Sequence, residues 1–110
     1  MAEKVQVIWR RAADREFHLA IAQGKENFGE AISARFTYSI IDQSFLLAAN
    51  PQMGQRRPEL DTPRRQMRSL LVHEHFQLIY YYHESKATVY IVSLWDTRKN
   101  PAGLRRSMRR

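Results

Sequence analysis

The sequence contains no cysteine and has few acidic side chains. Without cysteine the chain forms neither a disulfide nor a metal site with thiolate ligands. Its 11 Asp and Glu residues stand against 18 Lys and Arg residues, which gives a formal net charge of +7. A surface of this sign attracts nucleic acid, a ribosome or an acidic protein, although it also serves solubility alone. Charge therefore restricts the class of partner without choosing one.

Long hydrophobic runs are absent as well. No apolar stretch approaches the roughly 20 residues that a membrane span needs, and no signal-peptide core follows the first residues. We therefore expect a cytoplasmic protein without a membrane partner. Its 110 residues are enough for one domain and too few for two. We expect a single domain over residues 1–110 that ends in a basic tail at about residues 102–110.

Glycine and proline are scarce, with four of each, so their positions mark the breaks between elements. Gly24 closes a predicted helix over residues 10–23. Asn50-Pro51 closes a longer helix over residues 25–49, because a residue before proline is pushed out of the helical conformation. The apolar residues of this second helix recur at spacings of three and four: Phe28, Ala31, Ile32, Phe36, Ile40 or Ile41, Phe45 and Ala48. Together the two helices predict a helical hairpin.

In the rest of the chain the hydrophobic pattern has a period of two, which is typical of strands. Strands are predicted over residues 5–9, 67–72, 76–82 and 89–94. Short polar breaks join the last three strands into an antiparallel meander, while residues 50–65, rich in proline and arginine, predict an exposed loop. The order β-α-α-β-β-β predicts a two-layer α+β domain, with the helical hairpin packed on a mainly antiparallel four-stranded sheet.

Apolar side chains lie on both faces of the strand predicted over residues 76–82. Tyr80 and Tyr82 share one face and Tyr81 lies on the other. For Tyr80, packing in the core is favoured over stacking on a base. A sheet with helices on one face only should alternate more clearly between apolar and polar residues. We therefore expect the second face to be covered, and a partner is a natural candidate.

Three segments carry short motifs in a fixed order along the chain. Residues 45–57 hold a helix end, an Asn-Pro pair, a glycine and then basic residues. Residues 67–81 hold a strand with Arg68 and then an aromatic strand that ends in tyrosine. Residues 89–101 hold the last strand and the basic turn behind it. Taken together, these segments resemble the RelE/ParE superfamily of toxins from type II toxin–antitoxin systems.

The resemblance implies a toxin that inhibits growth and is neutralised by a cognate antitoxin, without a cofactor, a metal or a small-molecule ligand. Within the superfamily, RelE-like members cut mRNA on the ribosome, whereas ParE-like members act on DNA gyrase. Metal-independent RNA cleavage needs a base, an acid and cations that stabilise the phosphorane. At the strand end where the nuclease type has arginine, this chain has Val72, and no tyrosine follows Tyr90. The incomplete set favours a ParE-like toxin with gyrase as its target.

Two alternatives remain open. The first is a ribosome-dependent, metal-independent endoribonuclease that cuts mRNA, in which Arg68, Arg98 and Lys99 stabilise the developing charge. The second is a basic nucleic-acid-binding module or an inactive toxin homologue, which would not inhibit growth.

The candidate target-binding residues are basic side chains from four parts of the chain, namely the loop, the strand after it, the turn after the last strand and the tail. They are Arg56, Arg57, Arg65, Arg68, Arg98, Lys99, Arg105 and Arg106. Arg68 stands out because the family pattern places it on the open face of the sheet, although a strand arginine is also commonly a solvated edge residue. No metal site is predicted, because His73 and His75 at a tight turn have no third ligand nearby in the sequence.

Overall fold

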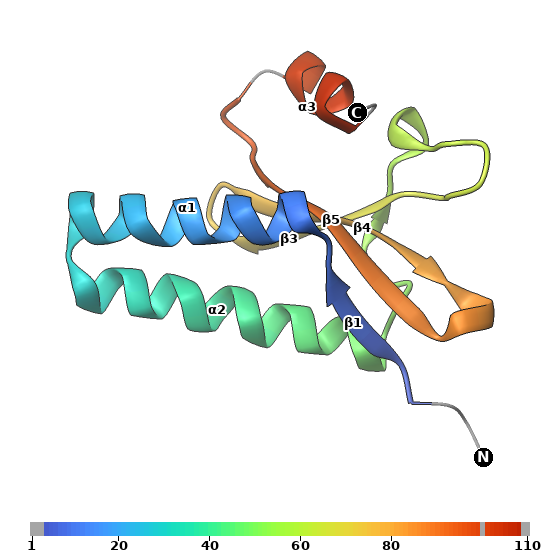
Figure 1. The fold of residues 1–110 in the computed structure, drawn as a ribbon, viewed down its shortest axis with the longest axis horizontal. Coiled ribbons are helices and arrows are strands. Elements are labelled where there is room, and N and C mark those ends of the chain that lie inside the picture. The colour runs from blue at the N-terminus through green and yellow to red at the C-terminus, as the bar shows by residue number, and fades with distance from the viewer. Residues whose placement is uncertain (1–3, 100, 109–110) are drawn as a thin grey trace.

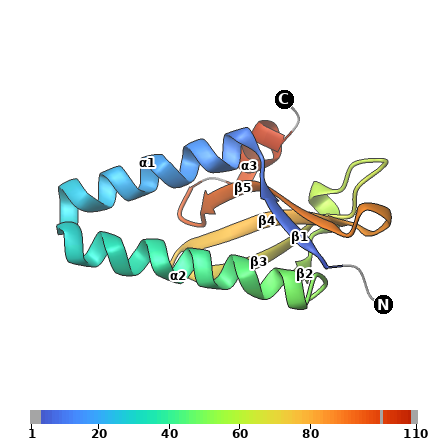
Figure 2. The same cartoon turned by 60° about the horizontal axis from the view of Figure 1, so that its bottom comes forward.

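Two long helices lie on one face of a sheet, and a short third helix lies on the other. The computed structural model describes residues 4–99 and 101–108. Its strands and helices follow the order β1 (Gln6–Trp9), α1 (Arg11–Phe28), α2 (Glu30–Ala49), β2 (Gln55–Arg56), β3 (Arg68–His73), β4 (Phe76–His83), β5 (Thr88–Asp96) and α3 (Pro101–Met108). Figures 1 and 2 show α1 and α2 side by side, and Figure 1 shows α3 across the sheet from α2. The predicted α+β class and the order β-α-α-β-β-β are confirmed, with β2 and α3 as additions.

The sheet has five strands in the order β1-β5-β4-β3-β2, one more than predicted. The additional strand, β2, pairs with β3 through Gln55 and Arg56, inside the segment predicted as a loop. Two residues are too few for a periodic pattern, so this pairing leaves no sign in the sequence. β1 is parallel to β5, and the other pairs are antiparallel, as the short connections between β3, β4 and β5 require.

The break between α1 and α2 lies at Gly29, so the predicted break at Gly24 is wrong. Gly29 has φ +89° and ψ 171°, a conformation that is essentially restricted to glycine. Gly24 instead lies inside α1, where a Cβ would stand 3.5 Å from the Ser33 Oγ of α2. That hydroxyl donates to the Ile21 carbonyl at 3.0 Å and joins the two helices. Gly24 therefore lies within α1 at ordinary contact distance from α2, and Gly29 is the glycine that turns the chain.

The buried side of α2 differs from the apolar stripe that its sequence predicted. Its buried residues are Ser33, Phe36, Ile40, Ser44 and Leu47. Two of these are serines, whose hydroxyls donate to helix carbonyls and so satisfy their polar groups inside the core. The stripe placed Ile32 and Phe45 inside, together with Phe28, which belongs to the end of α1; all three are exposed. The solvent side of α2 therefore carries large apolar side chains.

The main core fills the space between the helical hairpin and the sheet. Its buried residues are Ala13, Phe17, Phe36, Ile40, Leu47, Val72, Leu78, Tyr80, Val89, Ile91 and Leu94. Tyr80 is fully buried among them, which confirms its predicted packing role. Its hydroxyl accepts a hydrogen bond from the Gly54 N–H at 2.8 Å, so the polar end of the ring is satisfied.

A smaller core covers part of the second face of the sheet, the face opposite α1 and α2. Leu60, Met67 and Leu104 pack there against Ile79 and Tyr81. Because Leu104 belongs to α3 and Leu60 to the loop, the chain itself covers part of the face for which a partner was a natural candidate. The tail folds as a helix to do so. Within the described residues no helix is both long and apolar enough to cross a membrane.

Candidate target-binding surface

Two tyrosines stack on the second face of the sheet, and each has an arginine above its ring. Tyr81 of β4 and Tyr90 of β5 are cross-strand neighbours whose ring centroids lie 5.2 Å apart at 26°. The Arg65 guanidinium lies 4.9 Å from the centroid of Tyr81, and that of Arg10 lies 5.7 Å from the centroid of Tyr90. Arg10 also donates to the Tyr81 hydroxyl at 3.2 Å. The rings therefore hold two cations in fixed positions by cation–π attraction.

The two arginines reach the tyrosines from distant parts of the sequence. Arg10 lies between β1 and α1, where its backbone N–H donates to the Ile91 carbonyl of β5. Arg65 lies in the segment before β3, where Thr62 and Arg65 exchange backbone hydrogen bonds of 3.0 and 3.3 Å. Arg65 was a predicted target-binding residue, whereas Arg10 was not. In the sequence Arg10 is a single basic residue between a predicted strand and a predicted helix, and nothing in the pattern relates it to Tyr81 or Tyr90.

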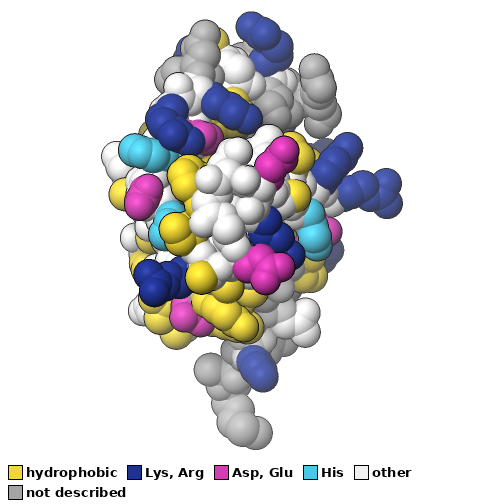
Figure 3. Space-filling view, turned by 90° about the vertical axis from the view of Figure 1, so that its left-hand side faces the viewer, with side chains coloured by type: hydrophobic (Ala, Val, Ile, Leu, Met, Phe, Trp, Pro, Cys, Tyr) yellow, Lys and Arg dark blue, Asp and Glu magenta, His cyan; other side chains and the backbone are white. Residues whose placement is uncertain are grey.

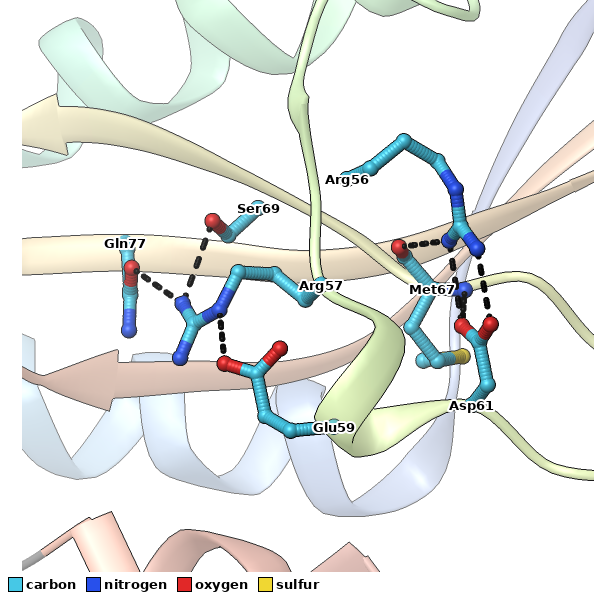
Figure 4. A network of polar contacts seen from close by, with 7 residues as sticks. All are labelled: Arg56, Arg57, Glu59, Asp61, Met67, Ser69 and Gln77. Atoms are coloured by element: carbon cyan, nitrogen blue, oxygen red, sulfur yellow. Dashed lines mark hydrogen bonds and ion pairs between the residues drawn. The ribbon is translucent and has the colours of Figure 1, made fainter.

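Arg57 crosses the second face beside this stack. Its guanidinium donates to the Ser69 hydroxyl at 3.2 Å and to the Gln77 side-chain oxygen at 3.3 Å, on neighbouring strands. It also donates to Glu59 at 2.7 Å, and this bond holds the pKa of the Glu59 carboxyl below its usual value. Figure 4 shows Arg57 lying between these groups. The Arg57 guanidinium is therefore held in place by Glu59 on one side and by Ser69 and Gln77 on the other.

Arg56, the next candidate, stabilises the loop. It donates to both carboxylate oxygens of Asp61, at 3.0 and 2.7 Å, and to the Met67 carbonyl at 2.6 Å (Figure 4). Asp61 in turn accepts the Met67 N–H at 2.6 Å. The bonds from Arg56, and then that from Met67, lower the pKa of Asp61 to about 2. Arg56 therefore stabilises the segment between β2 and β3 through its bonds to Asp61 and Met67.

Arg68 does not lie where the resemblance implied. It is the cross-strand neighbour of Tyr80 and lies on the same side of β3 as Leu70 and Val72. Tyr80 and Val72 are part of the main core, and Leu70 packs against it. Arg68 therefore belongs to the helix-facing side of the sheet, and its expected place on the open face is wrong. Its guanidinium donates to the carbonyls of Gln52 and Gly54, at 3.0 and 2.7 Å. These bonds join the segment between α2 and β2 to β3.

The remaining candidates divide between the two faces. Arg98 forms two hydrogen bonds with Asp96, of 3.0 and 2.8 Å, and lowers the pKa of that carboxyl. Asp96 is the cross-strand neighbour of Phe76, which packs against the main core, so this pair lies at the helix-facing side. The Lys99 ammonium lies 5.8 Å from the ring of Trp95, which packs against the smaller core. Lys99 therefore belongs to the second face.

The structure thus gathers a set of cations around the smaller core, which we call the basic face. Its members are Arg10, Arg57, Arg65, Lys99 and the exposed Arg105 and Arg106 of α3. Leu104, which directly precedes Arg105 and Arg106, is buried in that core and so anchors α3 on this face. Such a surface is suited to binding an acidic or polyanionic partner.

The set expected for RNA cleavage is not assembled. Val72, at the strand end that is an arginine in the nuclease type, is buried in the main core. Of the three charge-stabilising candidates, Arg68 and Arg98 lie at the helix-facing side of the sheet, and only Lys99 lies on the basic face. Among residues 4–99 and 101–108, no three His, Cys, Asp or Glu side chains are grouped so as to hold a metal ion.

Known proteins share both the sequence pattern and the fold. A family model described as the ParE toxin of the type II toxin–antitoxin system parDE matches residues 7–101. A solved structure, the chromosomal ParDE system from P. aeruginosa, superposes with a TM-score of 0.68 over 84% of this chain and 96% of that chain, at 16% identity. This second likeness concerns the fold alone, and among curated proteins none matches. Because the family model matches most of the chain, the protein belongs to the ParE toxins of type II toxin–antitoxin systems.

Proposed function

We propose that this toxin inhibits growth by binding DNA gyrase through the basic face. The observation that carries the proposal is the pair of arginines held over stacked tyrosines, Arg10 and Arg65, beside Arg57. Their neighbours restrain these guanidinium groups, so less side-chain entropy is lost when a partner binds them. The exposed Arg105 and Arg106 extend the same surface. Binding needs only such a surface, whereas RNA cleavage needs an acid and a base as well.

We further propose that a cognate antitoxin keeps the toxin inactive. The family is defined by toxin–antitoxin systems, and the similar solved structure is a ParDE system. A chain with a net charge of +7 suits an acidic, amphipathic segment that folds as it binds.

A groove at one end of the molecule suits the apolar residues of such a segment. It has a volume of about 440 Å³ and lies between the tip of the helical hairpin and the turn that joins β3 to β4. Phe28, Ile32, Phe36 and Phe76 line it, together with polar residues of the turn. Figure 3 shows this end, where hydrophobic side chains lie beside histidine and charged side chains.

The target is tested with purified gyrase and relaxed plasmid. The purified toxin should block supercoiling, and replacing the exposed pair, Arg105→Ala with Arg106→Ala, should weaken inhibition by roughly tenfold or more. Arg10→Ala with Arg65→Ala tests the tyrosine stack in the same way. The control is Lys25→Ala, an exposed cation near the tip of the helical hairpin that should leave inhibition unchanged. Unimpaired supercoiling at a large excess of toxin would contradict the gyrase target.

The same toxin preparation is added to a translating ribosome extract. Intact mRNA is expected, because Arg68 and Arg98 lie on the opposite side of the sheet from Lys99, so the three cations do not converge on one site. Cleaved mRNA would instead assign the chain to the ribosome-dependent endoribonucleases. Growth that continues after induction without antitoxin, with neither target affected, would mark an inactive homologue or a nucleic-acid-binding module.

A further inference from the structure

We propose that the outer face of α2 is a self-association surface, on which a second copy of this chain packs its own α2 in the antiparallel direction. In Figure 1, α2 lies below α1, and one of its sides is turned away from α1 and the sheet. Tyr38 and Phe45 each expose 67% of their surface on that side. Large aromatic side chains exposed on one helix face commonly mark an interface. This proposal does not depend on the target of the toxin.

The residues of this outer face follow one line along the helix. At spacings of four, three, four, three and four they are Ala31, Arg35, Tyr38, Asp42, Phe45 and Ala49, and all are exposed. Positions three and four apart lie on the same side of a helix, so these residues form one continuous row. Alanines lie at both ends, and aromatic rings alternate with charges between them.

The two charges of the row are opposite in sign and nearly symmetric about Tyr38. Arg35 precedes it by three residues and Asp42 follows it by four. The two charged residues are about 10 Å apart along the axis at 1.5 Å per residue, too far to pair within one helix. Neither forms an ion pair or a side-chain hydrogen bond with another described residue. Both side chains are therefore free to pair with a second molecule, and the two groups that pair with them would have opposite charges.

A second copy meets this requirement. In a two-fold interface, residue i of one copy meets residue j of the other, and j meets i. If the axis passes close to Tyr38, Arg35 of each copy faces Asp42 of the other, and two ion pairs form. The same register sets the small Ala31 against the large Phe45, so the surfaces interlock. The row is complementary to itself in both charge and size.

A partner of one charge fits the row less well. An acidic antitoxin segment would place its carboxylates against Asp42, and a polyphosphate would be repelled there too. The outer face carries one charge of each sign, while the chain as a whole carries +7. Charge therefore favours a second copy here and an acidic partner elsewhere.

The dimer is expected to be reversible. A helix of 20 residues is about 30 Å long, and one helix face buries less than the roughly 800 Å² per partner of a standard interface. The basic face is built from β4, β5, α3, the segment before β3 and Arg10, and the row on α2 includes none of them. Both basic faces would consequently stay available in the dimer.

Sedimentation equilibrium of the full chain over a wide concentration series tests the proposal. The wild-type chain should shift from monomer to dimer as its concentration rises. Asp42→Arg puts like charges opposite each other and should weaken the dimer by roughly tenfold or more. Adding Arg35→Asp to this variant reverses both charges and should restore the dimer. The matched control is Glu84→Arg, the same change at an exposed acid in the turn before β5, which should have no effect.

A disulfide test checks the position of the axis. The chain has no cysteine, so Tyr38→Cys introduces a single thiol, which should join two copies rapidly under mild oxidation. Leu19→Cys, an exposed apolar position on α1, is the control and should crosslink slowly. A monomer at every concentration, or a dimer that the charge changes leave unaltered, would overturn the proposal. So would variants that self-associate normally but no longer bind the antitoxin, because the row would then be the antitoxin site.

Discussion

At the scale of single residues, a small polar cluster joins the segment between α2 and β2 to the sheet. The Tyr80 hydroxyl accepts the Gly54 N–H at 2.8 Å, and Arg68 donates to the Gly54 carbonyl at 2.7 Å. A Cβ at Gly54 would lie 2.6 Å from that hydroxyl and 2.8 Å from the Ser69 carbonyl oxygen, so glycine is required by close approach. Burial raises the pKa of the Tyr80 phenol above its usual value. Arg68 and Tyr80 therefore stabilise the fold.

Tyr80→Phe tests this cluster. The change leaves the ring in place but removes the acceptor of the Gly54 N–H, a buried donor. An unsatisfied buried donor costs about 1–3 kcal/mol, so the free energy of unfolding should fall by that amount in urea denaturation. Tyr38→Phe is the matched control, because Tyr38 is 67% exposed and should change stability by less than about 0.5 kcal/mol. Equal effects of the two changes would contradict the assignment.

Asp61 makes stability depend on acid pH. Its pKa is lowered from 3.8 to about 2 in the folded protein, chiefly by Arg56. A carboxyl group whose pKa is lower in the folded state than in the unfolded state stabilises the fold at pH values above its unfolded-state pKa. This stabilisation is lost as the pH falls through the folded-state pKa. The urea midpoint should therefore drop between about pH 4 and about pH 2. Asp61→Asn should flatten that part of the profile, and an unchanged slope would show that Arg56 does not act through Asp61.

Glu16 should make stability depend on pH in the opposite direction from Asp61. This half-buried carboxylate of α1 accepts the Ser93 hydroxyl at 3.1 Å and the Leu94 N–H at 3.3 Å, where β5 extends beyond β1. Burial raises its pKa above 4.5 despite these bonds. The folded state therefore binds the proton more tightly, and this contribution to stability is lost as the pH rises through the folded pKa. Glu16→Gln keeps an acceptor oxygen and should remove that loss from the urea midpoints measured between about pH 4 and about pH 7.

At the scale of elements, the hairpin of α1 and α2 depends on a single glycine. Gly29→Ala should lower the free energy of unfolding by about 1–3 kcal/mol, because φ +89° with ψ 171° strains any residue with a Cβ. The open space around Gly29 excludes a steric clash as the cause. Gly24→Ala is the matched control, since its Cβ would make an ordinary contact with Ser33 and alanine gains up to about 1 kcal/mol inside a helix. Thermal unfolding of both variants decides the point, and a more stable Gly29→Ala would exclude the strained link.

The elements themselves could be predicted from sequence better than their ends could. Alternation identified β1, β3, β4 and β5, and the spacing of apolar residues identified both long helices. The helix link was misplaced because Gly24 resembles a helix end, whereas its role is a contact with Ser33 that only the packed helices create. The apolar stripe predicted for α2 was wrong for the same reason, because Ser33 and Ser44 face the core while the neighbouring Ile32 and Phe45 face outward.

At the scale of the whole molecule, the two sides of the sheet have different tasks. The helical hairpin fills one side with the main core, while a smaller core on the other side supports the cations of the basic face. Of the predicted site residues, Arg57, Arg65, Lys99, Arg105 and Arg106 reach that face. Arg10 could not be assigned from sequence, because its neighbours Tyr81 and Tyr90 lie at least 71 residues away along the chain. Tertiary structure alone brings them together.

The central claim, that this ParE-family chain stops growth through gyrase, is tested most directly in living bacteria. The chain is induced without an antitoxin, and DNA and protein synthesis are followed by pulse labelling from the moment of induction. We expect DNA synthesis to fall first, with protein synthesis following later, and the Arg105→Ala/Arg106→Ala variant to delay the arrest. An early fall of protein synthesis, with DNA synthesis still running, would contradict the claim and identify the ribosome as the target.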